Sequence, residues 1–237
     1  MKSKTFGTGI AALVATMMIT GCNGNTTYGD FDGAPLAELD TSGTPPRGVS
    51  IGGVDTLVVT RGEAFQIDVE GDDEARDLVR FALEGGMLKV GRANGSSRDT
   101  ATIRVTLPEV TSAAVGGSAD LEIDYMAGDA TIAVGGSGDA RIGEIDAASL
   151  KVSVGGSGDL EARGKADSID LSVGGSGTAD LKNLSVTRAS VAIGGSGDAK
   201  LSSNGEVTGA VGGSGGLEIS GGADCRVKTS GSASVDC

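Results

Sequence analysis

The sequence predicts an all-β fold: a single-stranded parallel β-helix (a β-solenoid) with coils of about 19 residues and an irregular N-terminal β cap. Three observations support this prediction. A Gly-rich element recurs at nearly constant spacing, short runs of alternating apolar and polar residues flank it, and the apolar residues are mostly small or β-branched. Gly accounts for 42 of the 237 residues, and its long period separates the chain from collagen and from flexible linkers.

The repeated element is Val-Gly-Gly-Ser, with Ile193 in place of Val in one copy. Its first Gly is Gly116, Gly135, Gly155, Gly174, Gly194 and Gly212, so the copies are 18 to 20 residues apart. A degenerate seventh copy, Ser-Gly-Ser in place of Gly-Gly-Ser, follows at 230–232. Gly at such a corner permits positive φ and a close approach of successive coils. We expect the Ser at the third position to form an internal hydrogen-bonded ladder. These residues are Ser118, Ser137, Ser157, Ser176, Ser196, Ser214 and Ser232.

Alternating runs on both sides of each corner predict half-buried strands. Leu150, Val152 and Val154 precede one corner, and Leu160 and Ala162 follow it, with polar residues between them. Coils of this kind stack as a parallel solenoid in which each strand pairs with its counterpart in the next coil. The general preference for right-handed parallel crossovers predicts a right-handed solenoid.

The region before the regular repeat contains strands without the Gly-Gly-Ser signature. We expect them to form irregular first coils or an N-terminal cap, which a solenoid needs because an open end exposes core and strand edges. The regular coils then run from about 111 to 237, within a solenoid domain of residues 47–237. The expected early strands are 54–60, 64–70, 80–84, 87–90 and 101–107.

The N-terminus resembles a bacterial lipoprotein signal, predicted to span residues 1–21. Lys2 and Lys4 form its basic region, and 10–20 is an apolar stretch too short to span a bilayer. The sequence at 19–22, Ile-Thr-Gly-Cys, resembles the lipobox, which predicts lipidation of Cys22. Asn23 after the Cys favours sorting to the outer membrane, on its periplasmic face or at the cell surface. Residues 22–46 are rich in Gly, Thr, Asp and Pro and predict a lipidated flexible tether.

Composition excludes several classes of function. The chain has no His and no Trp, so it has no Ser-His-Asp triad and no His-ligated zinc. A net charge of −13 and only six aromatic residues argue against binding nucleic acid. The stretch 212–216 matches G-x-S-x-G, but its Ser is simply the repeat's own Ser and no His is present. We therefore expect no catalytic residue.

An Asp follows several corners, at Asp120, Asp139, Asp159 and Asp198. Stacked carboxylates about 4.8 Å apart repel one another, so they stay solvated, share a cation, or accept hydrogen bonds from backbone N–H groups. The corner resembles a Ca²⁺-binding nonapeptide repeat, but its Asp comes one residue early and its period is too long. We therefore expect no cofactor, and keep Ca²⁺ as an alternative.

Cys225 and Cys237 are predicted to form a disulfide. Cys225 takes the inward position held by Leu150 and Ile169 in other coils, and Cys237 takes the position of Ile219. These positions face each other across the corner, and an exported protein permits the bond. The alternative is two small buried thiols.

The chain resembles the putative auto-transporter adhesin, head GIN domain family. The resemblance is carried by 48–63 (GVSIGGVDTLVVTRGE), by 86–90 (GMLKV) and by the repeated Gly-Ser-Gly-Asp elements, and covers about 47–237. It implies a β-solenoid, frequent occurrence as envelope lipoproteins and no known catalytic residues. The regular Val-Gly-Gly-Ser-Gly-Asp repetition departs from the family's pattern.

Together these features predict a non-enzymatic, lipid-anchored cell-envelope protein, an adhesin or envelope scaffold that presents a rigid acidic solenoid. Its expected partners are the membrane, through the lipid, and an envelope or extracellular protein or glycan. The alternatives are a β-helix carbohydrate-active enzyme and a calcium-stabilised structural module. The sequence leaves the oligomeric state open.

Overall fold

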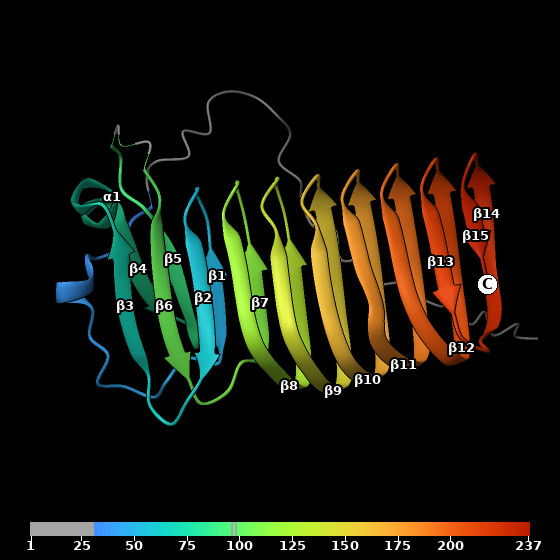
Figure 1. Ribbon diagram of the computed structural model, residues 1–237, viewed down its shortest axis with the longest axis horizontal. Coiled ribbons are helices and arrows are strands. Elements are labelled where there is room, and N and C mark those ends of the chain that lie inside the picture. The colour runs from blue at the N-terminus through green and yellow to red at the C-terminus, as the bar shows by residue number, and fades with distance from the viewer. Residues whose placement is uncertain (1–30, 96, 98) are drawn as a thin grey trace, which may run out of the picture.

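The computed structural model describes residues 31–95, 97 and 99–237, and confirms the predicted parallel β-solenoid (Figure 1). Fifteen strands belong to one continuous sheet that winds around the core. The strands are β1 (Gly48–Ile51), β2 (Thr56–Arg61), β3 (Gln66–Gly71), β4 (Val79–Glu84), β5 (Met87–Arg92), β6 (Ala101–Leu107), β7 (Ser112–Val115), β8 (Asp120–Val134), β9 (Ala140–Gly156), β10 (Leu160–Gly175), β11 (Thr178–Gly195), β12 (Asp198–Gly213), β13 (Gly216–Ser220), β14 (Asp224–Gly231) and β15 (Ser234–Asp236). The handedness of the coils stays a prediction.

Each long strand from β8 to β12 runs through one coil, from one glycine corner to the next. Its first half, such as 160–162 in β10, lies on what we call the leading face. Its second half, such as 168–175, lies on the trailing face, after a bend opposite the corner. Both halves pair in parallel with the coils before and after, so the two faces enclose a narrow core.

The uneven period of the repeat is absorbed at this far bend. At the corners, Gly174 pairs in register with Gly155 on one side and Gly194 on the other. The register shifts instead within the bend, for example between Ala162 and Gly164. The glycine corners therefore stack directly although successive copies differ by one or two residues in length.

Alternation places one row of small or aliphatic side chains inward on each face. Along the leading face one row contains seven residues that are at most 2% exposed: Leu57, Leu121, Ala140, Leu160, Ala179, Ala199 and Leu217. Burying each Leu stabilises the fold by about 1.5–3 kcal/mol relative to leaving it exposed. These rows continue into the cap, so cap and regular coils share one core.

The cap consists of the coil β5–β6 and two antiparallel strands, and the order of the first elements in space differs from their order in sequence. The coil β1–β2 lies between the coil β5–β6 and the first regular coil β7–β8. Strands β3 and β4 pair antiparallel with β6 and β5 at the outer end. A short helix that the sequence did not predict, α1 (Asp73–Leu78), links β3 to β4, and the Asp72 carboxylate accepts a hydrogen bond from the Glu74 amide at its start.

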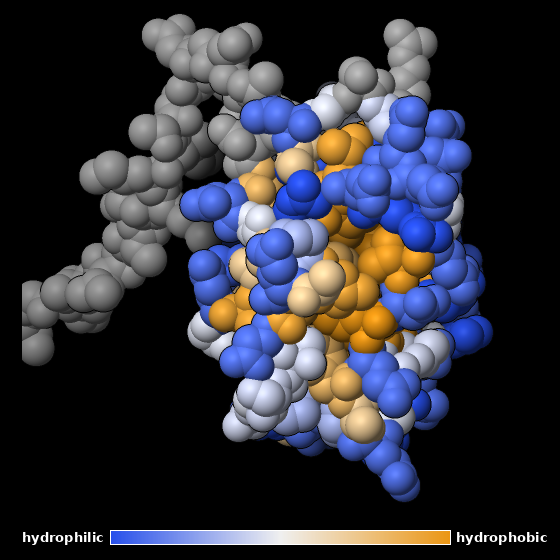
Figure 2. All heavy atoms as spheres, turned by 90° about the vertical axis from the view of Figure 1, so that its left-hand side faces the viewer, coloured by the Kyte–Doolittle hydropathy of each residue, from blue (hydrophilic) through white to orange (hydrophobic). Residues whose placement is uncertain are grey.

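Residues 31–39, which the sequence assigned to the flexible tether 22–46, lie on the cap, so that part of the prediction is wrong. Ala34 exchanges two backbone hydrogen bonds with Phe81 of β4, each 2.8 Å long. The short 3₁₀ helix η1 (Leu36–Glu38) follows, and Leu36 and Leu39 pack against the core. Figure 2 shows apolar side chains gathered at the centre of this end, with polar side chains around them.

Candidate functional site

The seven repeat serines stack along one edge of the solenoid, but not as the internal ladder that we expected. All seven are exposed, and their backbone amides make the ladder instead. Ser157 N–H, for example, donates to the Gly136 carbonyl of the preceding coil over 2.8 Å, and Ser176 N–H donates to Gly156 over the same distance. The hydroxyls of Ser118, Ser137, Ser157, Ser176, Ser196, Ser214 and Ser232 therefore face solvent.

Glycines, rather than serines, occupy the inward position at the corner. Gly158 and Gly177 are buried, and a Cβ on either would collide with the backbone of the coil before it. The second Gly of the corner is restricted too: Gly156 has φ of 93° and Gly175 has φ of 102°. Close stacking of backbones at this edge thus requires Gly at the second corner position. It also selects Gly at the fourth position in the coils from Gly138 to Gly215, whereas Ala119 and Ala233 occupy that position in the first and last copies.

The four repeated Asp residues act as caps between coils. The Asp120 carboxylate accepts from the Asp139 amide at 3.2 Å, and the Asp139 carboxylate accepts from the Asp159 amide at 3.1 Å. Asp159 accepts from the Thr178 amide at 2.8 Å, and Asp198 accepts from the Gly216 amide at 2.7 Å. Each carboxylate satisfies an N–H group that the corner leaves without a strand partner.

No cluster of three or more potential metal ligands occurs among residues 31–95, 97 and 99–237. A shallow groove of about 260 Å³ runs beside the Asp row, lined in part by Asp139, Asp159 and Thr178. Its open form and mixed charges provide no enclosed site for a reacting group.

The two faces of the solenoid present different chemistry. The outward row of the leading face carries charges of both signs at Glu122, Arg141, Glu161, Asp180, Lys200 and Glu218. The matching row of the trailing face is small and uncharged at Ala133, Ser153, Ser172, Ala192 and Ala210. The leading face therefore carries a ladder of charges. The trailing face combines this uncharged row with charged side chains in its other outward rows, at Lys151, Asp170, Arg188 and Glu206.

A buried ion pair that the sequence analysis missed joins the cap to the first corner. Asp55 is fully buried and accepts from the Arg92 guanidinium at 2.6 and 2.7 Å and from the Ala101 amide at 2.7 Å. The hydrogen bond to Asp55 raises the pKa of Arg92, so the buried guanidinium stays charged. The only sequence signal was an Asp at the corner position where the regular coils have Gly or Ala.

The chain that forms this solenoid, with its stacked glycine corners and its closed cap, matches one family of known proteins. The family described as "Putative auto-transporter adhesin, head GIN domain" matches residues 45–223. The chain belongs to this GIN-domain family. No curated protein matches it.

Solved structures share the fold of this GIN-domain protein at low sequence identity. A putative adhesin from Bacteroides fragilis has a TM-score of 0.71 at 19% identity, covering 81% of this chain and 92% of that chain. A putative adhesin from Parabacteroides distasonis has a TM-score of 0.69 at 16% identity, covering 82% and 93%. A putative lipid binding protein from the same species has a TM-score of 0.63 at 22% identity, covering 81% and 92%.

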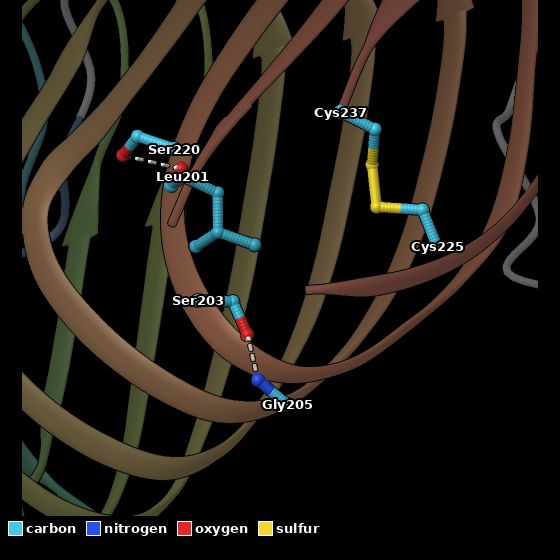
Figure 3. The surroundings of a disulfide bond; sticks show 6 residues. All are labelled: Leu201, Ser203, Gly205, Ser220, Cys225 and Cys237. Carbon is cyan, nitrogen blue, oxygen red and sulfur yellow. Dashed lines mark hydrogen bonds between the residues drawn. A yellow bond between two sulfur atoms is a disulfide. The ribbon is translucent and has the colours of Figure 1, made fainter. Parts of the chain in front are cut away.

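A disulfide forms within the last coil of this GIN-domain protein, as predicted. Cys225 in β14 and Cys237 after β15 are linked with a Cα–Cα distance of 6.5 Å (Figure 3). Cys225 pairs in register with the buried Val207 of the preceding coil, which is the inward position that the sequence indicated. The bond therefore ties the two faces of the terminal coil together.

The predicted lipidation residue, Cys22, lies outside the described residues. The amide of Phe31, the first described residue, donates to the Arg92 carbonyl at 3.2 Å, which places residue 31 at the cap of the GIN domain. Within the described part of the chain, no helix has the length and apolar character needed to cross a membrane.

Proposed function

We propose that this protein is a non-enzymatic cell-envelope lipoprotein whose solenoid serves as an adhesin or an envelope scaffold. The family match over residues 45–223 carries this proposal, because the family is described as the head domain of an adhesin. Two structural neighbours named as putative adhesins support it further.

The N-terminal sequence supports an anchor in the membrane. A basic region, an apolar stretch and Cys22 follow one another in the order of a lipoprotein signal. Several acyl chains, each contributing about 0.8 kcal/mol per buried CH₂, would hold the mature protein stably on the bilayer. We place the anchor in the outer membrane because Asn23 follows the Cys.

The surface chemistry supports binding rather than catalysis. In the described residues the Asp row is used for backbone capping, and the groove beside it is shallow and open. A rigid rod with a row of charges on one face and a row of small side chains on the other is suited to contact with a protein or glycan over a long surface. This function requires no cofactor.

Surface proteolysis with a lipidation variant tests the proposal. We expect Cys22→Ser to move the protein from the membrane fraction to the soluble fraction, while the control Cys225→Ser stays in the membrane. Protease added to intact cells should then cleave the wild-type domain. Cleavage only after permeabilisation would contradict adhesion to other cells and leave the scaffold function. A membrane-bound Cys22→Ser variant would contradict lipid anchoring.

A further inference from the structure

The two ends of the solenoid are built differently. At the N-terminal end, β3 and β4 reverse direction, and α1 and the segment 31–39 lie beside them. At the C-terminal end the final strands, β14 and β15, keep the parallel arrangement of the regular coils. Among the described residues, β14 pairs only with β12 and β15 only with β13, so each has one free edge (Figure 1).

The core is incompletely covered at this C-terminal edge. In the coil before it, Val207, Val211 and Leu217 are at most 2% exposed. In the last coil, Val227 and Val235 occupy equivalent inward rows but are only partly buried. Free N–H and C=O groups beside apolar side chains form a template for pairing with another strand.

We propose that a second copy of this chain covers this edge, in a tail-to-tail dimer in which β14 pairs antiparallel with β14 of the partner. The charges of the strand favour this occupant. Centred on Arg226, a two-fold axis places Asp224 opposite Lys228 of the other copy, and the symmetry creates this contact twice. Lys on an edge strand normally discourages pairing, but in this register each Lys meets a carboxylate.

The two Arg226 side chains at the centre are already neutralised within each copy. Arg226 contacts Glu206 at 2.9 Å and Asp224 at 2.8 Å. The Cys225–Cys237 disulfide fixes β14 relative to β15, so the two edges are presented together rather than independently.

If the protein is anchored as proposed above, a second copy of the chain is the molecule that the adhesin binds, and this step rests on that proposed function. Only eight residues lie between Cys22 and Phe31, so the nine steps from one to the other reach at most about 30 Å. The cap is thereby held near the membrane, and the opposite end, about 43 Å away along ten stacked strands, is free to face outward. Tail-to-tail pairing would then join molecules on opposing membranes.

Charge reversal at the edge tests the dimer directly. The chain from residue 23 to 237 retains every described strand and the whole described core, and its mass is measured by sedimentation equilibrium over a wide concentration range. We expect a monomer–dimer equilibrium. Lys228→Asp and Asp224→Lys should each weaken the dimer by about tenfold, because each change places like charges opposite one another twice.

An equimolar mixture of these two variants should restore the dimer, since every opposing pair is again of opposite sign. Lys151→Asp, an exposed change on the trailing face far from the edge, is the matched control and should leave the dimer intact. Circular dichroism confirms that each variant is folded. A wild-type monomer at all concentrations would overturn the proposal, and so would variants that fail to complement each other.

These outcomes are independent of membrane anchoring. A dimer of residues 23–237 in solution would support the edge pairing whether or not the full chain is lipidated at Cys22. A lipidated protein that is monomeric would leave the proposed envelope function standing and refute the edge pairing.

Discussion

Replacing Gly175 with Ala should destabilise the solenoid, whereas the same change at the adjacent Gly174 should not. Gly175 has φ of 102°, and a Cβ placed on it would collide with the backbone of Gly156 in the preceding coil. Gly174 has no heavy atom within 4 Å of such a Cβ. The two residues are adjacent in the same corner, so each is the natural control for the other.

The expected loss at Gly175 combines two effects. Ala in a left-handed conformation costs about 1–2 kcal/mol. The displaced Gly156 carbonyl accepts from Ser176 N–H at 2.8 Å, and weakening this hydrogen bond and its neighbour costs about 0.5–1.5 kcal/mol each. The total is about 2–5 kcal/mol, or a fall in Tm of about 4–20 °C for a domain of this size.

Urea unfolding followed by far-UV circular dichroism measures both variants. We expect Gly174→Ala to lie within about 0.5 kcal/mol of the wild type, or to gain up to about 1 kcal/mol because Ala restricts the unfolded chain. Equal losses at the two positions, or a larger loss at Gly174, would refute the argument that close stacking of coils selects Gly at the second corner position and not at the first.

Three further predictions concern the cap, the last coil and the Asp row. Asp55→Ala leaves the buried Arg92 and the Ala101 N–H without their acceptor and should cost about 3–5 kcal/mol in denaturant unfolding. Arg104→Ala, which removes only an exposed pair with Glu70, should cost under about 1 kcal/mol, and a similar loss for both would contradict a special role for Asp55. The disulfide links residues 12 apart in sequence, and its reduction should lower the free energy of unfolding by about 2–3 kcal/mol. An unfolding midpoint that does not change with reductant would show that the disulfide does not stabilise the last coil. Asp159→Ala should lower the free energy of unfolding by about 0.5–1.5 kcal/mol, because it leaves the Thr178 amide without its acceptor. Since the carboxylates serve as caps, Ca²⁺ should not raise Tm relative to EDTA. A saturable rise in Tm would establish a cation site.

The repeat made the regular part of the fold predictable, because period, alternation and the corner glycines all specify the same coil. β6 occupies the predicted residues 101–107, and β4 and β5 differ from their predictions by one or two residues at one end. The orientation of the corner side chains was not predictable in the same way. Counting in twos from the inward Val134 makes both Gly136 and Gly138 inward, but only Gly138 is buried, because the positive φ of Gly136 interrupts the alternation.

The buried pair between Asp55 and Arg92 had no comparable signal. It occurs once, between residues 37 apart in sequence, and no repeat copies reveal its pattern. Its partner depends on the spatial order of the cap, which places β5 beside β1. Sequence reasoning that assumes successive coils are neighbours therefore cannot bring these two residues together.

That spatial order also links the cap to the regular coils. The coil β1–β2 has the cap coil β5–β6 on one side and β7–β8 on the other, so both of its edges are completed only by later parts of the chain. Its corner, with φ of 110° at Gly53, is the first in the glycine stack, and Gly53 O accepts from Ser118 N–H at 2.8 Å. The same coil is tied to the cap by Asp55. It is thus the template on which the regular solenoid stacks, and weakening its attachment to the cap removes support from the first regular coil as well.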